Sequence, residues 1–154
     1  MSPSPVNSYN VRMVLGHRIL LLLAALACGG CNQPNFDPAY ATRPYPFQLH
    51  TTDTLPIQVF RDGTSLEIVN STNESWGASM IWVNQQYAHE LPGLAPGQRV
   101  TFNLFNFRND LGESFNAGGP FRTREPTPVR LVELQPGEDQ PLVGFVAIRD
   151  GVEE

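Results

Sequence analysis

From Ile57 onward the chain consists of short apolar runs separated by turn residues, and this spacing limits the possible folds more than any other feature. Turn signals recur about every 8 to 12 residues, as in sandwiches and barrels of short antiparallel strands. No stretch carries a long helical stripe of apolar residues at i, i+3, i+4 and i+7. The sequence therefore predicts an all-β domain of about seven short antiparallel strands. The expected strands are 57–60, 66–69, 80–83, 87–91, 100–104, 129–134 and 142–148.

Size and strand number favour two packed sheets. Residues 57–150 resemble an immunoglobulin-like or fibronectin-III-like β-sandwich in these two respects. The resemblance covers architecture only, because both cysteines precede residue 57 and the Cys…Trp…Cys pattern of immunoglobulin domains is absent. The residues expected in the core are Trp82, Phe102, Leu104, Leu131 and Phe145.

A different pattern occupies the N-terminus. The apolar run Ile19–Ala27 follows His17 and Arg18 and leads into small residues and a cysteine, which is the layout of an export signal. The run is too short for a membrane span, which needs about 20 apolar residues. We therefore interpret residues 1–27 as a signal segment, with a positive region to residue 18 and translation starting at Met1 or Met13.

The end of this segment, Ala25-Leu26-Ala27-Cys28, resembles the lipobox of bacterial lipoproteins. The resemblance implies that Cys28 carries a lipid and becomes the first residue of the mature protein. Cys31 is the alternative, although a cysteine then stands three positions before it. Because Gly29 stands where an aspartate would signal inner-membrane retention, the resemblance implies the outer membrane of the bacterial cell envelope, facing the periplasm or the exterior.

The signal segment is followed by a proline-rich stretch without apolar periodicity, which predicts an extended tether over residues 28–56. It contains the aromatic residues Phe36, Tyr40, Tyr45 and Phe47. We expect some of these rings to fold back onto the domain. Residues 151–154 form a short acidic tail after the domain.

The charge balance argues against one class of partner. The full chain has a net charge of −5, and loss of Arg12 and Arg18 with the signal leaves about −7. An acidic domain argues against nucleic-acid binding, which is favoured by a basic surface. Because the only cysteines are Cys28 and Cys31, the domain has no disulfide and no cysteine-ligated metal.

Catalytic and metal-binding patterns are weak. His89 is the only histidine expected inside the domain, because His50 falls in the predicted tether, and no G-x-S-x-G motif occurs. The segment 109–113 has three oxygen-bearing side chains around a glycine, which we interpret as a tight turn in preference to a calcium loop. We therefore expect no catalytic residue, no metal and no cofactor.

Aromatic side chains indicate a binding function more strongly than any residue pattern indicates catalysis or metal binding. Trp76 lies in a polar loop beside Asn73, and with Tyr87 it could stack on a sugar ring or contact a protein partner. The alternative is that Trp76 covers the end of the core. Arg108, Arg122 and Arg124 are expected to form surface ion pairs with neighbouring acids.

Together these patterns predict a non-enzymatic envelope protein that is attached to the membrane through its N-terminal lipid. Its β domain would serve as a binding or structural module for an envelope protein or a glycan. Two alternatives are a small carboxylate-dependent envelope hydrolase and a carbohydrate-binding module with exposed aromatic side chains.

Overall fold

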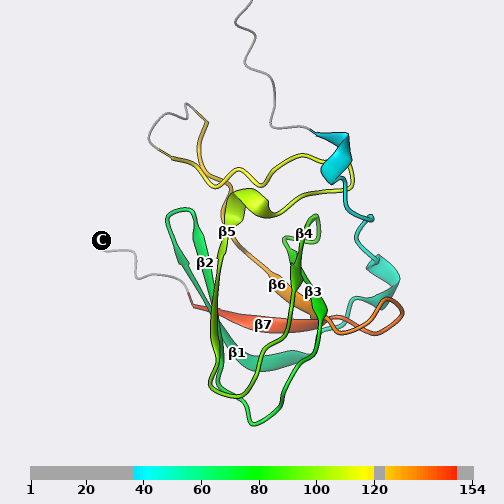
Figure 1. Ribbon diagram of the computed structural model, residues 1–154, viewed down its shortest axis with the longest axis vertical. Coiled ribbons are helices and arrows are strands. Elements are labelled where there is room, and N and C mark those ends of the chain that lie inside the picture. Colours follow the sequence, from blue (N-terminus) through cyan, green and yellow to red (C-terminus); the bar gives the residue numbers. More distant parts are fainter. Residues whose placement is uncertain (1–36, 120–123, 149–154) are drawn as a thin grey trace, which may run out of the picture. The chain divides into compact units, whose positions relative to one another are not determined.

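The computed structural model describes residues 37–119 and 124–148, which belong to one compact unit (Figure 1). The predicted lipidation site at Cys28 or Cys31 and the acidic tail lie outside the described residues. Within them there is no α-helix and no helix that could cross a membrane. The strands are β1 (Thr54–Asp62), β2 (Ser65–Asn70), β3 (Ser79–Val83), β4 (Tyr87–Leu91), β5 (Arg99–Asn103), β6 (Val132–Gln135) and β7 (Val143–Ile148). Three short 3-10 helices are η1 (Pro38–Tyr40), η2 (Phe47–Leu49) and η3 (Leu104–Asn106).

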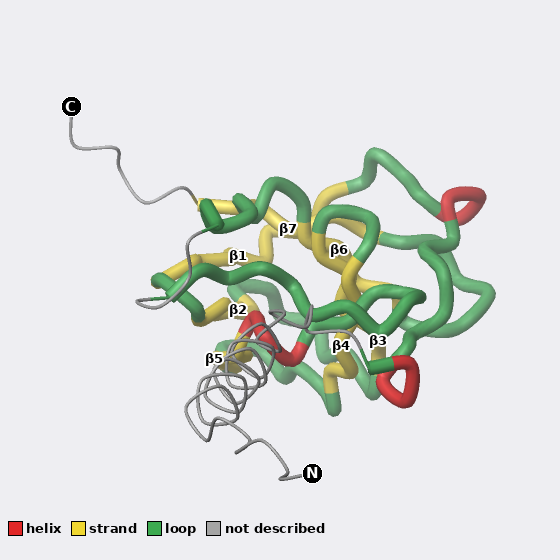
Figure 2. The backbone as a smooth tube through the Cα atoms, turned by 90° about the horizontal axis from the view of Figure 1, so that it is seen from above, coloured by secondary structure: helices red, strands yellow, loops and turns green. Residues whose placement is uncertain are grey.

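The seven strands form one curled sheet in the order β4-β3-β6-β7-β1-β2-β5 (Figures 1 and 2). Its neighbouring strands are antiparallel except β1 and β7, which run parallel. The predicted all-β class and the seven strands are therefore confirmed. The immunoglobulin-like sandwich with antiparallel pairs throughout is not found, because all seven strands belong to a single mixed sheet.

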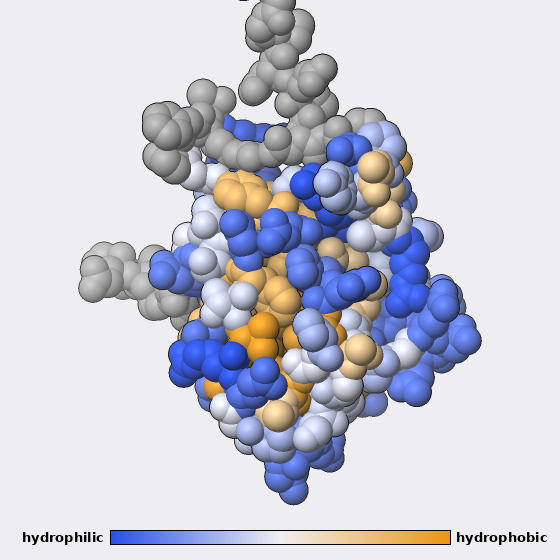
Figure 3. All heavy atoms as spheres, in the orientation of Figure 1, coloured by the Kyte–Doolittle hydropathy of each residue, from blue (hydrophilic) through white to orange (hydrophobic). Residues whose placement is uncertain are grey.

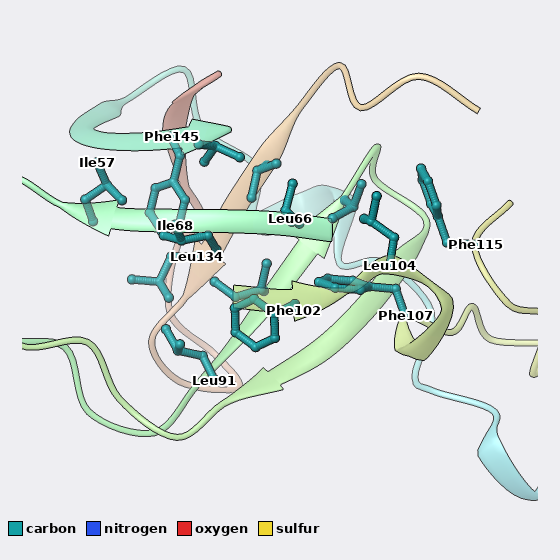
Figure 4. Close-up of a cluster of buried hydrophobic side chains, with 14 of the residues drawn as sticks. Ile57, Leu66, Ile68, Leu91, Phe102, Leu104, Phe107, Phe115, Leu134 and Phe145 are labelled. Atoms are coloured by element: carbon teal, nitrogen blue, oxygen red, sulfur yellow. The ribbon is translucent and has the colours of Figure 1, made fainter. Parts of the chain in front are cut away.

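The curling of the sheet explains why its sequence resembles that of a sandwich. Every strand contributes inward-facing apolar side chains to one core, among them Ile57, Ile68, Leu134 and Phe145 (Figure 4). A sheet that curls on itself needs the same alternation of apolar and polar residues as two separate packed sheets. The alternation therefore predicts the inner face correctly but does not specify which strands pair.

A long irregular segment between β5 and β6 fills one end of the curled sheet. Leu104, Phe107 and Phe115 from this segment are fully buried in the core, where Figure 4 shows Phe107 beside Phe102. Arg61 at the end of β1 holds the segment, since its guanidinium donates hydrogen bonds to the carbonyl groups of Thr127 (2.6 Å) and Ala117 (3.2 Å). Strand β6 begins at Val132, three residues later than the predicted start at residue 129.

Residues 37–53, which we call the strap, pack against the domain instead of forming part of an extended tether. Tyr45 is only 7% exposed. Backbone hydrogen bonds join Thr42 to Asn109 (2.9 Å) and Leu142 to Leu49 (2.9 Å). The prediction of a tether reaching residue 56 is therefore wrong for these residues, and the expected folding back of an aromatic ring is confirmed at Tyr45. Prolines in the strap restrict its backbone without preventing it from packing.

Gly112 offers a direct test of the contact between the strap and the irregular segment. Its φ is +83°, and a Cβ atom at this position would overlap the backbone carbonyl of Asp37 in the strap. Gly97 has a similar φ of +71°, but a Cβ atom there would meet open space. Gly97→Ala therefore carries the backbone penalty alone, whereas Gly112→Ala carries the same penalty and a steric clash.

We expect Gly112→Ala to lower the free energy of unfolding by about 1–3 kcal/mol more than Gly97→Ala, the usual cost of overpacking. Urea unfolding of both variants followed by tryptophan fluorescence measures the difference. Equal losses of stability in the two variants would contradict the packing of the strap on this turn.

Candidate functional site

The chemically distinctive part of the domain lies on the outer face of β6. Val132 and Leu134 of β6 point into the core, so Glu133 and Gln135 point to the opposite face. Both polar side chains are nevertheless buried, because the strap covers this face. Trp82 of β3 is paired with Glu133 and is also fully buried there.

Glu133 is the centre of a hydrogen-bonded triad with Tyr45 and His50 of the strap. Its Oε2 atom accepts a hydrogen bond from the Tyr45 hydroxyl (2.8 Å), and its Oε1 atom lies 2.7 Å from His50 Nδ1. The Tyr45 hydroxyl also lies 3.1 Å from the same nitrogen. Each oxygen of the buried carboxylate therefore has a partner from the strap, which compensates for its removal from water.

The triad places a hydrogen on one particular nitrogen of the histidine ring. A carboxylate accepts hydrogen bonds and donates none, so His50 Nδ1 carries the hydrogen that faces Glu133. The His50 side chain is 36% exposed, and its other nitrogen, Nε2, forms no hydrogen bond with the described residues. A histidine supported by a carboxylate in this way can act as a base or ligand. Among residues 37–119 and 124–148, the hydroxyl that contacts this ring is that of Tyr45, which donates its hydrogen to Glu133.

A second polar network continues along the same face. Gln135 Oε1 accepts hydrogen bonds from Trp82 Nε1 (3.0 Å) and from Arg43 Nη2 (2.8 Å). The Arg43 guanidinium also pairs with Glu138 across 3.3 Å, while Gln135 Nε2 donates to the Glu138 carbonyl (2.8 Å). The strap is thus joined to both β6 and the turn after it.

An open groove of about 450 Å³ borders this second network. Its lining combines charged residues (Arg43, Glu90 and Glu138) with apolar ones, including Met80 and Pro92. Ligand sites commonly have a concave, mixed lining of this kind. The groove lies over the ends of β3, β4 and β6, which supply five of its eleven lining residues, and the strap and loops supply the others.

The curled sheet remains open between its edge strands, β4 and β5. His89 of β4 contacts the rings of Phe102 and Phe107, each at a centroid separation of 5.2 Å. Figure 3 shows apolar side chains on the molecular surface between these two strands. His89 lies on a hairpin strand as expected, and its Nδ1 atom bonds the carbonyl of Glu90 (2.8 Å).

The three residues predicted to bind a ligand do not share one surface. Trp76 packs against the core and pairs with Leu94 beyond the end of β4, whereas Tyr87 begins β4 and packs on Phe115. Asn73 is exposed in the loop between β2 and β3. The partial burial of Trp76 agrees with its covering one end of the core.

The segment 109–113 forms the expected tight turn. Asn109 Oδ1 accepts hydrogen bonds from the backbone of Leu111 (3.0 Å) and of Glu113 (2.7 Å), so the asparagine serves the turn itself. In the described part of the chain, no three histidine, cysteine or acidic side chains lie close enough together to hold a metal ion. Of the arginines expected to form ion pairs, Arg122 lies outside the described residues.

His50 lies in the strap and bonds Glu133, so its predicted place in an extended tether is wrong. One signal could have indicated the covered face. In β3, Met80-Ile-Trp-Val83, apolar residues occupy both faces, which is typical of a strand covered on both sides. A polar residue on the neighbouring strand would then need buried partners. No such partner can be identified from sequence spacing alone.

No protein-family model, curated protein or solved structure matches this chain in the three comparisons. What the site can do is therefore inferred from its own geometry.

The triad predicts a specific dependence of stability on pH. Burial and the hydrogen bond to Glu133 raise the pKa of Tyr45 above its usual value. In the unfolded chain a tyrosine loses its proton near pH 10, so the folded state retains a proton that the unfolded state has lost above this pH. The free energy of unfolding should therefore fall above about pH 10, by up to about 1.4 kcal/mol per pH unit from this residue.

Tyr45→Phe should remove this part of the pH dependence and, at pH 7, cost about 1–3 kcal/mol because a buried carboxylate oxygen loses its donor. Tyr40→Phe is the matched control at pH 7, because its exposed ring should give a change within about 0.5 kcal/mol. Urea unfolding at pH 7 and between pH 9 and 11 measures both effects. An unchanged alkaline slope in Tyr45→Phe would contradict the role of the triad.

Proposed function

We propose that this protein is a non-enzymatic lipoprotein of the bacterial cell envelope whose β domain binds a partner at the membrane surface. The observation that carries the proposal is the sequence Ala25-Leu26-Ala27-Cys28 directly after a short apolar run. This combination supports export followed by attachment of a lipid to Cys28. The membrane in question would be the outer membrane, because Gly29 follows the cysteine.

The geometry of the buried triad supports a structural role for its carboxylate. Both Glu133 oxygens are engaged by Tyr45 and His50, so the carboxylate is committed to holding the strap. A catalytic carboxylate needs access to a substrate and a proton to exchange with it. The groove beside Arg43 and Glu138 is the surface that we assign to ligand binding, because its mixed lining is accessible.

One observation favours the alternative of a small carboxylate-dependent hydrolase. Glu90 and Glu138 both line the groove, and paired carboxylates are the machinery of glycoside hydrolysis. We prefer the binding function because Glu138 is already engaged by Arg43. The release of reducing ends from purified peptidoglycan tests the alternative, and a release that is lost in Glu90→Gln would favour the hydrolase.

The lipid anchor is tested by comparing Cys28→Ser with Cys31→Ser. We expect Cys28→Ser to abolish sedimentation with the membrane fraction, because the thioether attachment site is lost. The β domain should keep its unfolding midpoint, since position 28 precedes the described residues. Cys31→Ser is the matched control and should fractionate like the unchanged protein.

Mass spectrometry of the mature N-terminus provides the direct readout, with a thioether-linked diacylglycerol expected on Cys28. An unmodified N-terminus would overturn the proposal, and a lipid on Cys31 would transfer the attachment to that residue.

A further inference from the structure

A cluster of apolar residues is exposed on the strap and on the tight turn beside it. Tyr40 in η1 is 61% exposed, and Leu111 in the turn is 58% exposed. Ala39 and Ala41, on either side of Tyr40, are also exposed. Figure 3 shows apolar side chains over η1 at the upper right of the molecule. We call these four residues the apolar corner.

The two segments that form the apolar corner are held together by the backbone. Asp37 donates to the carbonyl of Gly112 (3.3 Å), and Thr42 donates to that of Asn109 (2.9 Å). Asn109 is itself buried and braces the turn through its side chain, as described above. Leu111 therefore lies on a hydrogen-bonded turn with its side chain exposed to solvent. In this position the side chain contributes little to the core.

Tyr40 contacts a neighbouring charge. The Arg108 guanidinium lies over the Tyr40 ring at 5.3 Å from its centroid, a cation–π geometry. Tyrosine has an apolar ring and a polar hydroxyl, a combination favoured at the boundary between lipid and water. An exposed tyrosine beside an exposed leucine thus provides a shallow contact for that boundary.

The apolar corner lies close to the proposed lipid anchor, which favours the membrane as its partner. The described part of the chain begins at Asp37, one residue before η1. Only nine residue steps separate Asp37 from Cys28, and nine fully extended residues span about 30 Å. If Cys28 carries a lipid, residues 39–41 of the apolar corner are therefore among the described residues closest in sequence to the bilayer.

We infer that the apolar corner rests on the lipid surface and orients the domain there. This inference depends on the proposed lipid anchor. The lipid supplies the membrane affinity, because a few partly exposed apolar side chains bury too little area to hold a protein on a bilayer by themselves. The exposed Asp37 and Asp110 flank the corner while the Arg108 guanidinium lies over Tyr40, so charges of both signs are present. The favoured surface is therefore zwitterionic, and the contact should depend little on salt.

The test measures the membrane depth of Leu111 in the lipidated full-length protein. Cys31→Ser provides a background without a free thiol, and Leu111→Cys then carries a bimane label. The protein is reconstituted in phosphatidylethanolamine and phosphatidylcholine vesicles that contain lipids with a nitroxide on the headgroup. Ser71→Cys, labelled in the same way, is the matched control: Ser71 is exposed beyond the opposite end of β2 and β5.

We expect the label at position 111 to be quenched at least about twofold more than the label at position 71, because nitroxide quenching acts over a short range at the headgroup level. Unchanged thermal unfolding of the labelled variants establishes that both are folded. A second variant, Tyr40→Ser in the Leu111→Cys background, should reduce the quenching at position 111.

Equal quenching at the two positions, in protein that floats with the vesicles, would overturn the inference and leave the anchor intact. Failure of the protein to float with the vesicles would overturn the proposed anchor, and the inference with it. The two failures are therefore distinguishable.

Discussion

The buried carboxylate of Glu133 is the interaction on which the arrangement of this domain depends. An unpaired charge inside a protein costs several kcal/mol, so the outer face of β6 is stable only when donors cover it. Tyr45 and His50 provide these donors from a segment that lies more than 80 positions away in the sequence. The strap is therefore required for the stability of the sheet.

This requirement links the strap to the curled sheet. Trp82 and Leu142 pack beside Tyr45 in a second apolar cluster on the outer face, while the main core fills the inside of the curl. The strands around β6 are thus covered on both faces. Strand β1 follows the strap directly and pairs in parallel with β7, so the two ends of the domain are joined within one sheet. Loss of the strap would expose apolar surface as well as a charge.

The sequence predicted local structure well and long-range pairing poorly, for an identifiable physical reason. Alternation within each strand depends on side chains that are close in sequence, so all seven strands could be located from their patterns. The parallel pairing of β1 with β7 depends on which strand edges meet, and alternation carries no information about this. For the same reason, alternation predicts a single curled sheet and two packed sheets equally well.

The site was missed for a related reason. Prolines around Tyr45 suggested an extended tether, since a polyproline-like backbone needs no partners of its own. An extended backbone can equally lie across a covered sheet, and the choice depends on Glu133, whose burial no local pattern shows. His50 was misassigned with the rest of the segment. Trp76, in contrast, lies where its polar loop placed it, although it packs against the core.

The packing of the strap also shortens the distance that the domain could reach from a lipid anchor. A tether from residue 28 to residue 56 would allow a reach of about 90 Å, whereas the nine residue steps from Cys28 to Asp37 span at most about 30 Å. Under the proposed anchor, this difference restricts the domain to partners at or near the membrane surface. Because Arg43 in the strap lines the groove, the segment that shortens the reach also shapes the surface that we assign to binding. Anchoring, the position of the groove and the stability of the sheet would then all depend on the same seventeen strap residues, 37–53.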